Sequence, residues 1–241
     1  PALHEVANFS WFIGVFLGTT GYGARMHYDY YKNSATHNTL TVNQTNQPPA
    51  NSDVLGWHMG EEYLWLDTET DWGKPPPQLN SHTRVEWDVE SWRDVRFRRR
   101  LLWLDDVLID LSTVENPHRQ QLDWTLHLAA DALDQSGEPQ PFSLSGPLQA
   151  MRNATVTPLH GCQPRHFSHQ GETFALWLSG DGELWQGLEA DNPAIGDLSY
   201  LVLRNHLPQA RFVCVWDLAK QSPLTEVCVH HTAVGTQLTV W

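Results

Sequence analysis

Short apolar stretches that alternate with polar positions recur along the whole chain. Each is bounded by Gly, Pro, Asn or Asp and is rich in β-branched or aromatic residues, a pattern typical of β-strands. No segment shows apolar spacing of comparable strength at the helical period. The pattern predicts an all-β fold with few or no helices and with strands at residues 9–17, 39–43, 63–66, 84–89, 95–104, 107–114, 122–128, 174–178, 200–204, 211–216, 226–230 and 236–240.

The breaks between these stretches are short, with the clearest at residues 47–52, 73–78 and 134–142. The triplet Pro75–Pro77 forces an extended loop in the second break. None of the breaks is long enough for a convincing linker, and the chain has no internal repeat. We therefore expect residues 1–241 to form a single domain. For this many antiparallel strands, the expected architecture is a large β-sandwich of the supersandwich type, with a barrel as the alternative.

The composition narrows the possible partners. The 28 acidic and 15 basic residues give a formal net charge of −13, which disfavours a nucleic acid or an anionic membrane surface. The one dense basic run, at residues 96–100, alternates with apolar residues and predicts a strand with a solvated face. Cys162, Cys214 and Cys228 have no CxxC spacing, so neither a disulfide framework nor a thiolate zinc site is supported. The 12 tryptophans suit a β-rich core or a surface that stacks on sugar rings.

Tyrosines and histidines crowd into one segment, where Tyr28, Tyr30 and Tyr31 lie between His27 and His37. A tyrosine can act as a base or an acid when a neighbouring cation or a buried site lowers its pKa from about 10. Tyrosines that fill the edge of a core are the structural alternative, and the residues alone favour that alternative.

A metal site is a second possibility from the residues. His37, Asp53 and His82 are far enough apart to come from neighbouring strands or loops. Two histidines and one carboxylate with an open position would suit zinc. Because the chain has 13 histidines, including the competitors His58 and His118, the spacing by itself does not select this set. No organic cofactor is expected.

The segment GYGARMHYDYYKNSATHNTLTVNQTNQPP, from Gly21 to Pro49, resembles the opening of the C-terminal β domain of the heparinase II/III-like polysaccharide lyases, which include alginate and oligoalginate lyases. Two later stretches are also similar to that domain. The corresponding elements are Gly21-Tyr22-Gly23, His27 to Tyr31, Thr36-His37-Asn38-Thr39, Val42-Asn43 and Gln47, then Phe97 to Leu128 with Asp123, Trp124 and His127, and Tyr200 to Leu218.

The resemblance implies that this chain is the C-terminal part of a longer lyase. Full-length members carry a helical toroid before the β domain, and the groove of the toroid supplies part of the active site. The partners implied are this N-terminal helical domain and an acidic polysaccharide or oligosaccharide, with no nucleic acid and no membrane. The fragment without the toroid is expected to be weakly active or inactive.

The implied chemistry is β-elimination on a glycan that contains uronic acid, of the alginate or heparin/heparan type. A base removes the C5 proton, and the 4-linked oxygen leaves with a proton from an acid, while the negative charge on the carboxylate is neutralised. In these lyases a tyrosine and histidines share the proton transfers, and His37 matches the histidine of the β domain. The implied catalytic residues are His37 and Tyr63, then Tyr31 and Tyr30, and the implied substrate-binding residues are His27, Tyr28, Asn38 and Arg25.

Several members also hold a structural zinc in this domain through two histidines and an aspartate, at intervals close to those of His37, Asp53 and His82. One imidazole cannot easily serve as both an inner-sphere ligand and a free proton acceptor, so His37 is either a ligand beside the site or the catalytic residue. The expected location is the bacterial periplasm or the exterior, or the cytoplasm if imported oligosaccharides are the substrate. A non-catalytic carbohydrate-binding or structural β domain is the alternative function.

Overall fold

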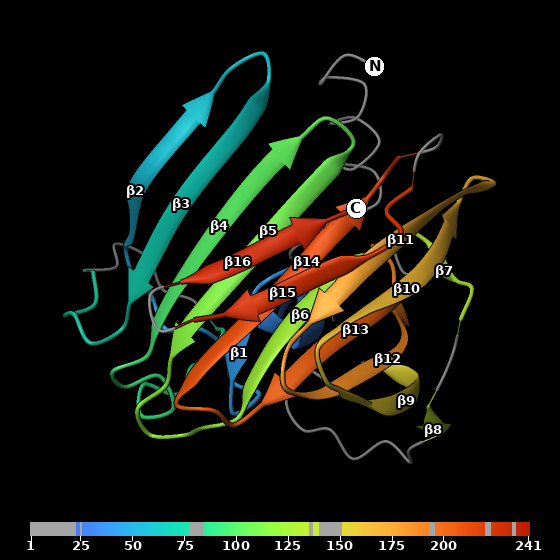
Figure 1. Ribbon diagram of the computed structural model, residues 1–241. Coiled ribbons are helices and arrows are strands. Elements are labelled where there is room, and N and C mark those ends of the chain that lie inside the picture. Colours follow the sequence, from blue (N-terminus) through green and yellow to red (C-terminus); the bar gives the residue numbers. More distant parts are fainter. Residues whose placement is uncertain are drawn as a thin grey trace.

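The chain folds into two large antiparallel sheets, as Figure 1 shows for the computed structural model. The structure describes residues 23–24, 26–77, 84–134, 137–139, 151–192, 196–219, 223–232 and 235–241. Helix is confined in these residues to two short segments, the π-helix η1 (His27–Tyr31) and the 3-10 helix η2 (Ser34–Thr36). The prediction of an all-β antiparallel sandwich is confirmed.

The first sheet has six strands, and β6 lies between β1 and β13. Every neighbouring pair in this sheet is antiparallel. In spatial order the strands are β1 (Leu40–Val42), β6 (Leu122–Leu128), β13 (Asp197–Asn205), β12 (Gly182–Ala190), β9 (Arg152–Leu159) and β8 (Glu138–Pro139).

The second sheet has eight strands, also antiparallel throughout, and β2 forms one edge of it. In spatial order the strands are β2 (Ser52–Met59), β3 (Tyr63–Asp71), β4 (Arg96–Leu104), β5 (Val107–Glu115), β14 (Gln209–Asp217), β11 (Glu172–Ser179), β10 (Cys162–His169) and β7 (Asp131–Ala132). A tight turn at Asp105 and Asp106 joins β4 to β5, and Asp105 takes a positive φ of 45° there.

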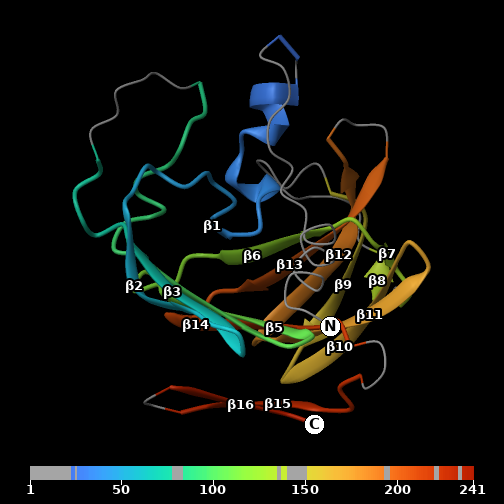
Figure 2. The same ribbon diagram turned by 90° about the horizontal axis from the view of Figure 1, so that it is seen from above.

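Figure 2 shows the molecule from above, with the two sheets face to face and a further segment over the outer face of each. The main core lies between the two sheets, where Trp124 and Leu126 of β6 pack in one cluster with Phe212 and Cys214 of β14. A hairpin of β15 (Val227–His231) and β16 (Thr236–Val240) covers the outer face of the eight-stranded sheet through Val227. The segment with η1 and η2 covers the outer face of the six-stranded sheet, so β6 is buried on both of its faces.

Most predicted strands that fall on described residues are present, but the one at residues 84–89 is wrong. Residues 84–89 are not part of any strand in the structure. Their backbone is instead held by side chains, because Asn46 donates to the carbonyl of Glu86 at 2.9 Å and Asp88 accepts from the backbone of Glu90 at 3.0 Å. The strand expected at residues 9–17 lies outside the described residues.

The structure adds long strands that the sequence pattern did not reveal, namely β2, β9, β10 and β12. Pro158 and Pro164 interrupt the pattern in β9 and β10, and Gly187 interrupts it in β12, where the register with β9 shifts. Among the described residues, none of the helices is long and apolar enough to span a membrane.

Candidate active site

His37 lies between η2 and β1, on the outer face of the six-stranded sheet. Hydrogen bonds from β6 and β4 hold the backbone of its segment. The hydroxyl of Thr125 on β6 lies 2.6 Å from the carbonyl oxygen of His37 and 2.8 Å from that of Thr39. The backbone N–H of His127 donates to Oδ1 of Asn38 at 2.8 Å, and Nη1 of Arg99 donates to the carbonyl of Asn38 at 2.6 Å. Both sheets therefore hold the segment that carries His37.

The imidazole of His37 is half-buried, and one contact sets its tautomer. Oγ1 of Thr36 lies 3.0 Å from Nδ1 of His37. The hydroxyl of Thr36 has one proton, and the backbone carbonyls of Asn33 at 2.7 Å and Tyr31 at 3.2 Å are its acceptors, so its oxygen is left to accept from His37. This places the proton on Nδ1 and the lone pair on Nε2. Burial lowers the pKa of His37, and the nearby His127 lowers it further, which favours the neutral ring at neutral pH.

A buried polar network lies beneath this segment. Oε1 of Glu189 on β12 is paired with Nδ1 of His127, and its Oε2 accepts from the hydroxyl of Tyr30. Glu189 and His127 are both fully buried, and the ring of His127 stacks on Tyr200 with centroids 4.4 Å apart. Nε2 of His127 has no hydrogen-bond partner among the residues described. A fully buried carboxylate is stable only when it is hydrogen-bonded or paired with a cation. Through its contacts with Tyr30 and His127, Glu189 links β12 to η1 and β6.

The tyrosines of η1 act as hydrogen-bond donors within the fold. The hydroxyl of Tyr31 donates to the carbonyl of Asp191 at 2.6 Å. Burial raises the pKa of Tyr30, and the adjacent Glu189 raises it further, while burial is also the main cause of the raised pKa of Tyr31. Both effects oppose formation of a tyrosinate, so the two phenols are disposed to hold η1 in place rather than to accept a proton.

Tyr63 is not brought to His37. It lies at the turn between β2 and β3, where its exposed ring is 4.4 Å from the ring of His58. The other end of β3 is the end that approaches the His37 segment, because Thr68 and Thr70 line one cavity together with Thr39. Tyr63 therefore faces solvent at the far end of its strand.

The residues expected to bind substrate occupy different environments. His27 is fully buried, and its ring centroid is 4.5 Å from that of Tyr28. The side-chain amide of Asn38 is bound to β6, because its Oδ1 accepts from the backbone N–H of His127. Tyr28 is half-buried, lines an open cavity with Asn46 and Glu86, and carries the guanidinium of Arg84 5.4 Å from its ring centroid. Arg25 lies outside the described residues.

The expected zinc ligands can be placed only in part, since His82 also lies outside the described residues. Asp53 is exposed on β2 and forms an ion pair with Lys74 at 2.8 Å. Within the described part of the chain, no group of three His, Cys, Asp or Glu side chains is close enough to hold a metal ion. Asp53 and His37 alone do not make a zinc site, so no chemical step is assigned to zinc.

The basic run on β4 does not present free cations. Arg98 and Arg100 form ion pairs with Asp67 at 2.6 and 3.3 Å, and Arg96 is 3.4 Å from both Asp71 and Glu115. Arg99 is on the opposite face of the strand, where it pairs with Asp110 and donates to Asn38. The expected solvated face exists, but Arg99 points to the interior and supports the His37 segment.

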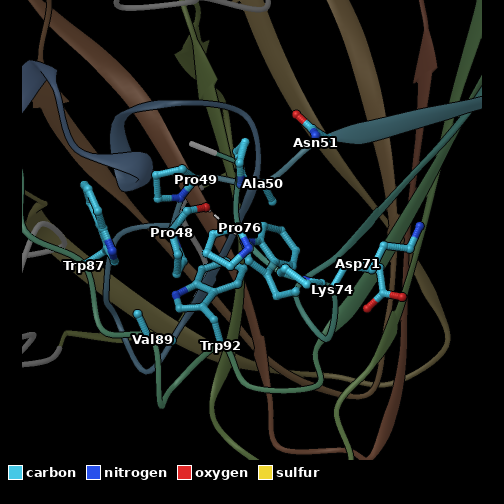
Figure 3. Close-up of a pocket in the computed structure, with 13 residues that line it drawn as sticks. Pro48, Pro49, Ala50, Asn51, Asp71, Lys74, Pro76, Trp87, Val89 and Trp92 are labelled. Atoms are coloured by element: carbon cyan, nitrogen blue, oxygen red, sulfur yellow. Dashed lines mark hydrogen bonds between the residues drawn. The ribbon is translucent and has the colours of Figure 1, made fainter. Parts of the chain in front are cut away.

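Two cavities extend from this segment along the adjoining surface. A polar cavity of about 250 Å³ is lined by Thr39, Gln47, Ser52, Thr68, Thr70 and Arg99, among others. It shares Pro48, Ala50 and Trp72 with a second cavity of about 250 Å³, which we call the Pro–Trp pocket. Figure 3 shows Trp87 at one side of this pocket and Lys74 with Asp71 toward the other, with Pro76 between them. Its lining is Pro48, Pro49, Ala50, Asn51, Asp71, Trp72, Lys74, Pro75, Pro76, Pro77, Trp87, Val89 and Trp92.

Neither His127 nor Glu189 was among the site residues predicted from the sequence. The Asp-Trp-x-x-His pattern of β6 carried a usable signal, since alternation places Asp123, Thr125 and His127 on one face and apolar residues on the other. Glu189 gave no comparable signal, because only the packing of β12 beside β13 under η1 shows that its carboxylate is buried.

The comparisons with known proteins agree with this architecture. The family model described as Heparinase II/III-like, C-terminal, matches residues 15–203. A solved structure entitled heparinase III gene product superposes with a TM-score of 0.56 at 12% identity, covering 94% of this chain and 32% of its own. The heparan sulfate lyase HepC from Pedobacter heparinus superposes with a TM-score of 0.50 at 12% identity, covering 95% of this chain and 34% of its own. At this identity the structures show a shared fold, and the chain spans about a third of their length. No match was found among the curated proteins.

Proposed function

Because the chain belongs to the family of heparinase II/III-like C-terminal domains, we propose that it contributes His37 to the active site of a polysaccharide lyase. The observation that supports this role is the state of the His37 side chain. It is half-buried, it is held by Thr36 with its proton on Nδ1, and its backbone is fixed by Thr125. A rigid imidazole with a lone pair on Nε2 is suited to proton transfer.

The proposed reaction is β-elimination next to a uronic acid carboxylate. A base takes the proton from C5, and the electron pair of that C–H bond forms the C4–C5 double bond. The C4–O bond breaks in turn, and the departing oxygen takes a proton from an acid. We assign to Nε2 of His37 one of these proton transfers, because the phenols of Tyr30 and Tyr31 are engaged within the fold.

The rest of the active site is proposed to come from an N-terminal helical domain of the same protein. The support is that the chain covers only 32% of the solved heparinase III structure that it resembles. The proposed substrate is a heparin/heparan- or alginate-type glycan in the periplasm, at the cell exterior or, after import, in the cytoplasm. With Asp53 bound to Lys74, we propose that His37 acts as a proton carrier and not as a zinc ligand.

Replacement of His37 by Ala or Gln in the complete protein tests the proposal. Loss of a general acid or base is expected to lower the rate of cleavage by at least about 100-fold. Cleavage is followed through the ultraviolet absorbance of the new C4–C5 double bond on uronate polymers. His58→Ala, which removes another histidine from the surface of β2, is the matched control and should leave the rate unchanged. Wild-type activity in both His37 variants would exclude the proposed role.

A non-catalytic carbohydrate-binding domain is the second candidate function, and the Pro–Trp pocket favours it because aromatic walls suit sugar rings. The two functions differ in one result. A binding domain predicts saturable affinity for an oligosaccharide in the complete protein without any new double bond, and with no effect of His37→Gln on that affinity.

A further inference from the structure

We propose that the Pro–Trp pocket is a subsite for an uncharged sugar residue of the same glycan chain whose uronic acid lies at His37. This inference rests on the proposed lyase function. It assigns to the substrate a uronic acid combined with an uncharged sugar at a nearby position, in contrast to a polymer made of uronic acids alone.

The walls of the pocket are flat and apolar. Trp72 and Trp92 pack with ring centroids 4.4 Å apart, and both indole N–H groups are used inside the fold. Trp72 donates to the carbonyl of Pro48, and Trp92 donates to the hydroxyl of Thr45, each at 3.0 Å. What these residues present to the pocket is therefore ring carbon, alongside the proline rings and Trp87. Such surfaces match the C–H face of a pyranose ring.

The charges at the pocket favour an uncharged ring over a uronate. The two charged residues in its lining, Asp71 and Lys74, already have partners. Nζ of Lys74 is 2.8 Å from Asp53, and Asp71 is 3.4 Å from Arg96. Trp87 is flanked in the sequence by the exposed acids Glu86 and Asp88. No unpaired cation from the described residues lines the pocket, so a carboxylate there would lose water without gaining a counter-charge.

The position of the pocket connects it to the candidate active site. It shares Pro48, Ala50 and Trp72 with the polar cavity, and that cavity contains Thr39, two residues after His37. Thr68 and Thr70 line the polar cavity. Their hydroxyl oxygens lie 3.4 Å from the carbonyl of Arg99 and 2.6 Å from the hydroxyl of Ser52, and each can still accept from a sugar hydroxyl. The two cavities therefore adjoin and extend from the Pro–Trp pocket to the segment that carries His37, and the proposed glycan chain follows them. The volume of about 250 Å³ is below the 300 Å³ or so of a drug-sized site and suits a single ring.

Trp87→Ala in the complete protein tests the subsite, in a His37→Ala background in which turnover is expected to be slow. Dissociation constants are measured by calorimetry for two probes, an alternating uronate/N-acetylhexosamine tetrasaccharide and a uronate-only alginate tetrasaccharide. Loss of the indole is expected to weaken binding of the alternating probe by about tenfold and to change binding of the uronate-only probe by less than twofold. Trp57→Ala removes a tryptophan that is 68% exposed on β2, outside the pocket, and should change neither constant.

The possible outcomes separate the subsite from the lyase function. Unchanged affinity of Trp87→Ala for the alternating probe would overturn the subsite, and equal losses for both probes would overturn its preference for an uncharged ring. Trp87→Phe, which keeps an aromatic face, should retain most of the affinity if folding is intact. If the wild-type protein cleaves no uronate polymer, the lyase function fails, whereas a Trp87-dependent affinity for the alternating probe would still establish the pocket.

Discussion

Strands β6 and β2 show opposite relations between residue type and burial. All seven residues of β6 are buried, although Asp123, Thr125 and His127 are polar. In β2 seven of the eight residues are exposed, and among them Trp57 and Met59 are 68% and 71% exposed. The difference follows from position, because β6 has a strand on each side and a layer over each face, whereas β2 forms the edge of its sheet. In these two strands, burial depends more on the position of the strand in its sheet than on the hydropathy of its residues.

The buried polar face of β6 is also where the candidate active site is anchored. Thr125 and His127 hold the His37 segment, and Asp123 forms an ion pair with Arg204 at 2.6 Å. Burial raises the pKa of Asp123 even though Arg204 opposes the shift. Polar groups at such a depth contribute less to stability than apolar ones of the same size. Their presence is consistent with a role in positioning the site.

The largest expected effect compares one tryptophan from each strand. Trp124→Ala on β6 should lower the free energy of unfolding by about 3–5 kcal/mol, because it leaves a cavity between the sheets. Trp57→Ala on β2 should change it by less than about 0.5 kcal/mol, because the indole is mostly in solvent. Urea denaturation measures both values, and equal losses would contradict the contrast between the strands.

A smaller effect is expected from the polar network behind β6. Tyr30→Phe removes the hydroxyl that donates to Glu189 and leaves the carboxylate with His127 as its remaining side-chain partner. We expect a loss of about 1–3 kcal/mol in the free energy of unfolding. The same change at the exposed Tyr63 should be almost silent and serves as the control. If Tyr30→Phe leaves the free energy of unfolding unchanged, the buried carboxylate of Glu189 does not depend on this donor.

The smallest effect concerns β3, the strand next to β2, where the buried Asp67 forms ion pairs with the half-buried Arg98 and Arg100. Hydrogen bonds from Arg98 are the main cause of the lowered pKa of Asp67 on β3. A carboxyl with a lowered folded pKa stabilises above its unfolded pKa of about 3.9, and that contribution is lost as the pH falls through the lower folded value. Asp67→Asn should therefore cost about 1–2 kcal/mol at pH 7, and the difference from wild type should shrink below pH 4. Urea denaturation at several pH values measures it, and a difference that stays constant down to pH 2 would exclude the ion pair as the cause.

Much of the fold could be predicted from the strand pattern, and the failures have a common cause. Residues 122–128 and 236–240 form strands with the predicted bounds, because their alternation is uninterrupted. Residues 84–89 show the same alternation, yet Asn46 binds the backbone of Glu86 in place of a neighbouring strand. Alternation reports a preference for extended backbone, but a strand also needs a partner, and that partner is remote in the sequence.

The candidate site was only partly predictable for the same reason. The family resemblance identified His37 as the residue of the β domain to test, and the structure places Oγ1 of Thr36 3.0 Å from its Nδ1, a contact that favours a proton on Nδ1. The pairing of His127 with Glu189, 62 residues apart in the chain, has no local signature. The exposure of Tyr63 at a turn end and the ion pair of Asp53 with Lys74 likewise depend on contacts between distant segments.

Periodicity and local motifs are properties of neighbouring residues, so the order of the amino acids was sufficient to predict the class of the fold, the family and the short segment that carries His37. The packing of distant segments determines which polar groups of β6 and β12 are buried together and which tyrosines are held by hydrogen bonds. It also determines that prolines and tryptophans from two loops form one pocket beside Thr39. Burial and pairing depend on the order of the strands in space, and that order is set by the packing of the two sheets as a whole.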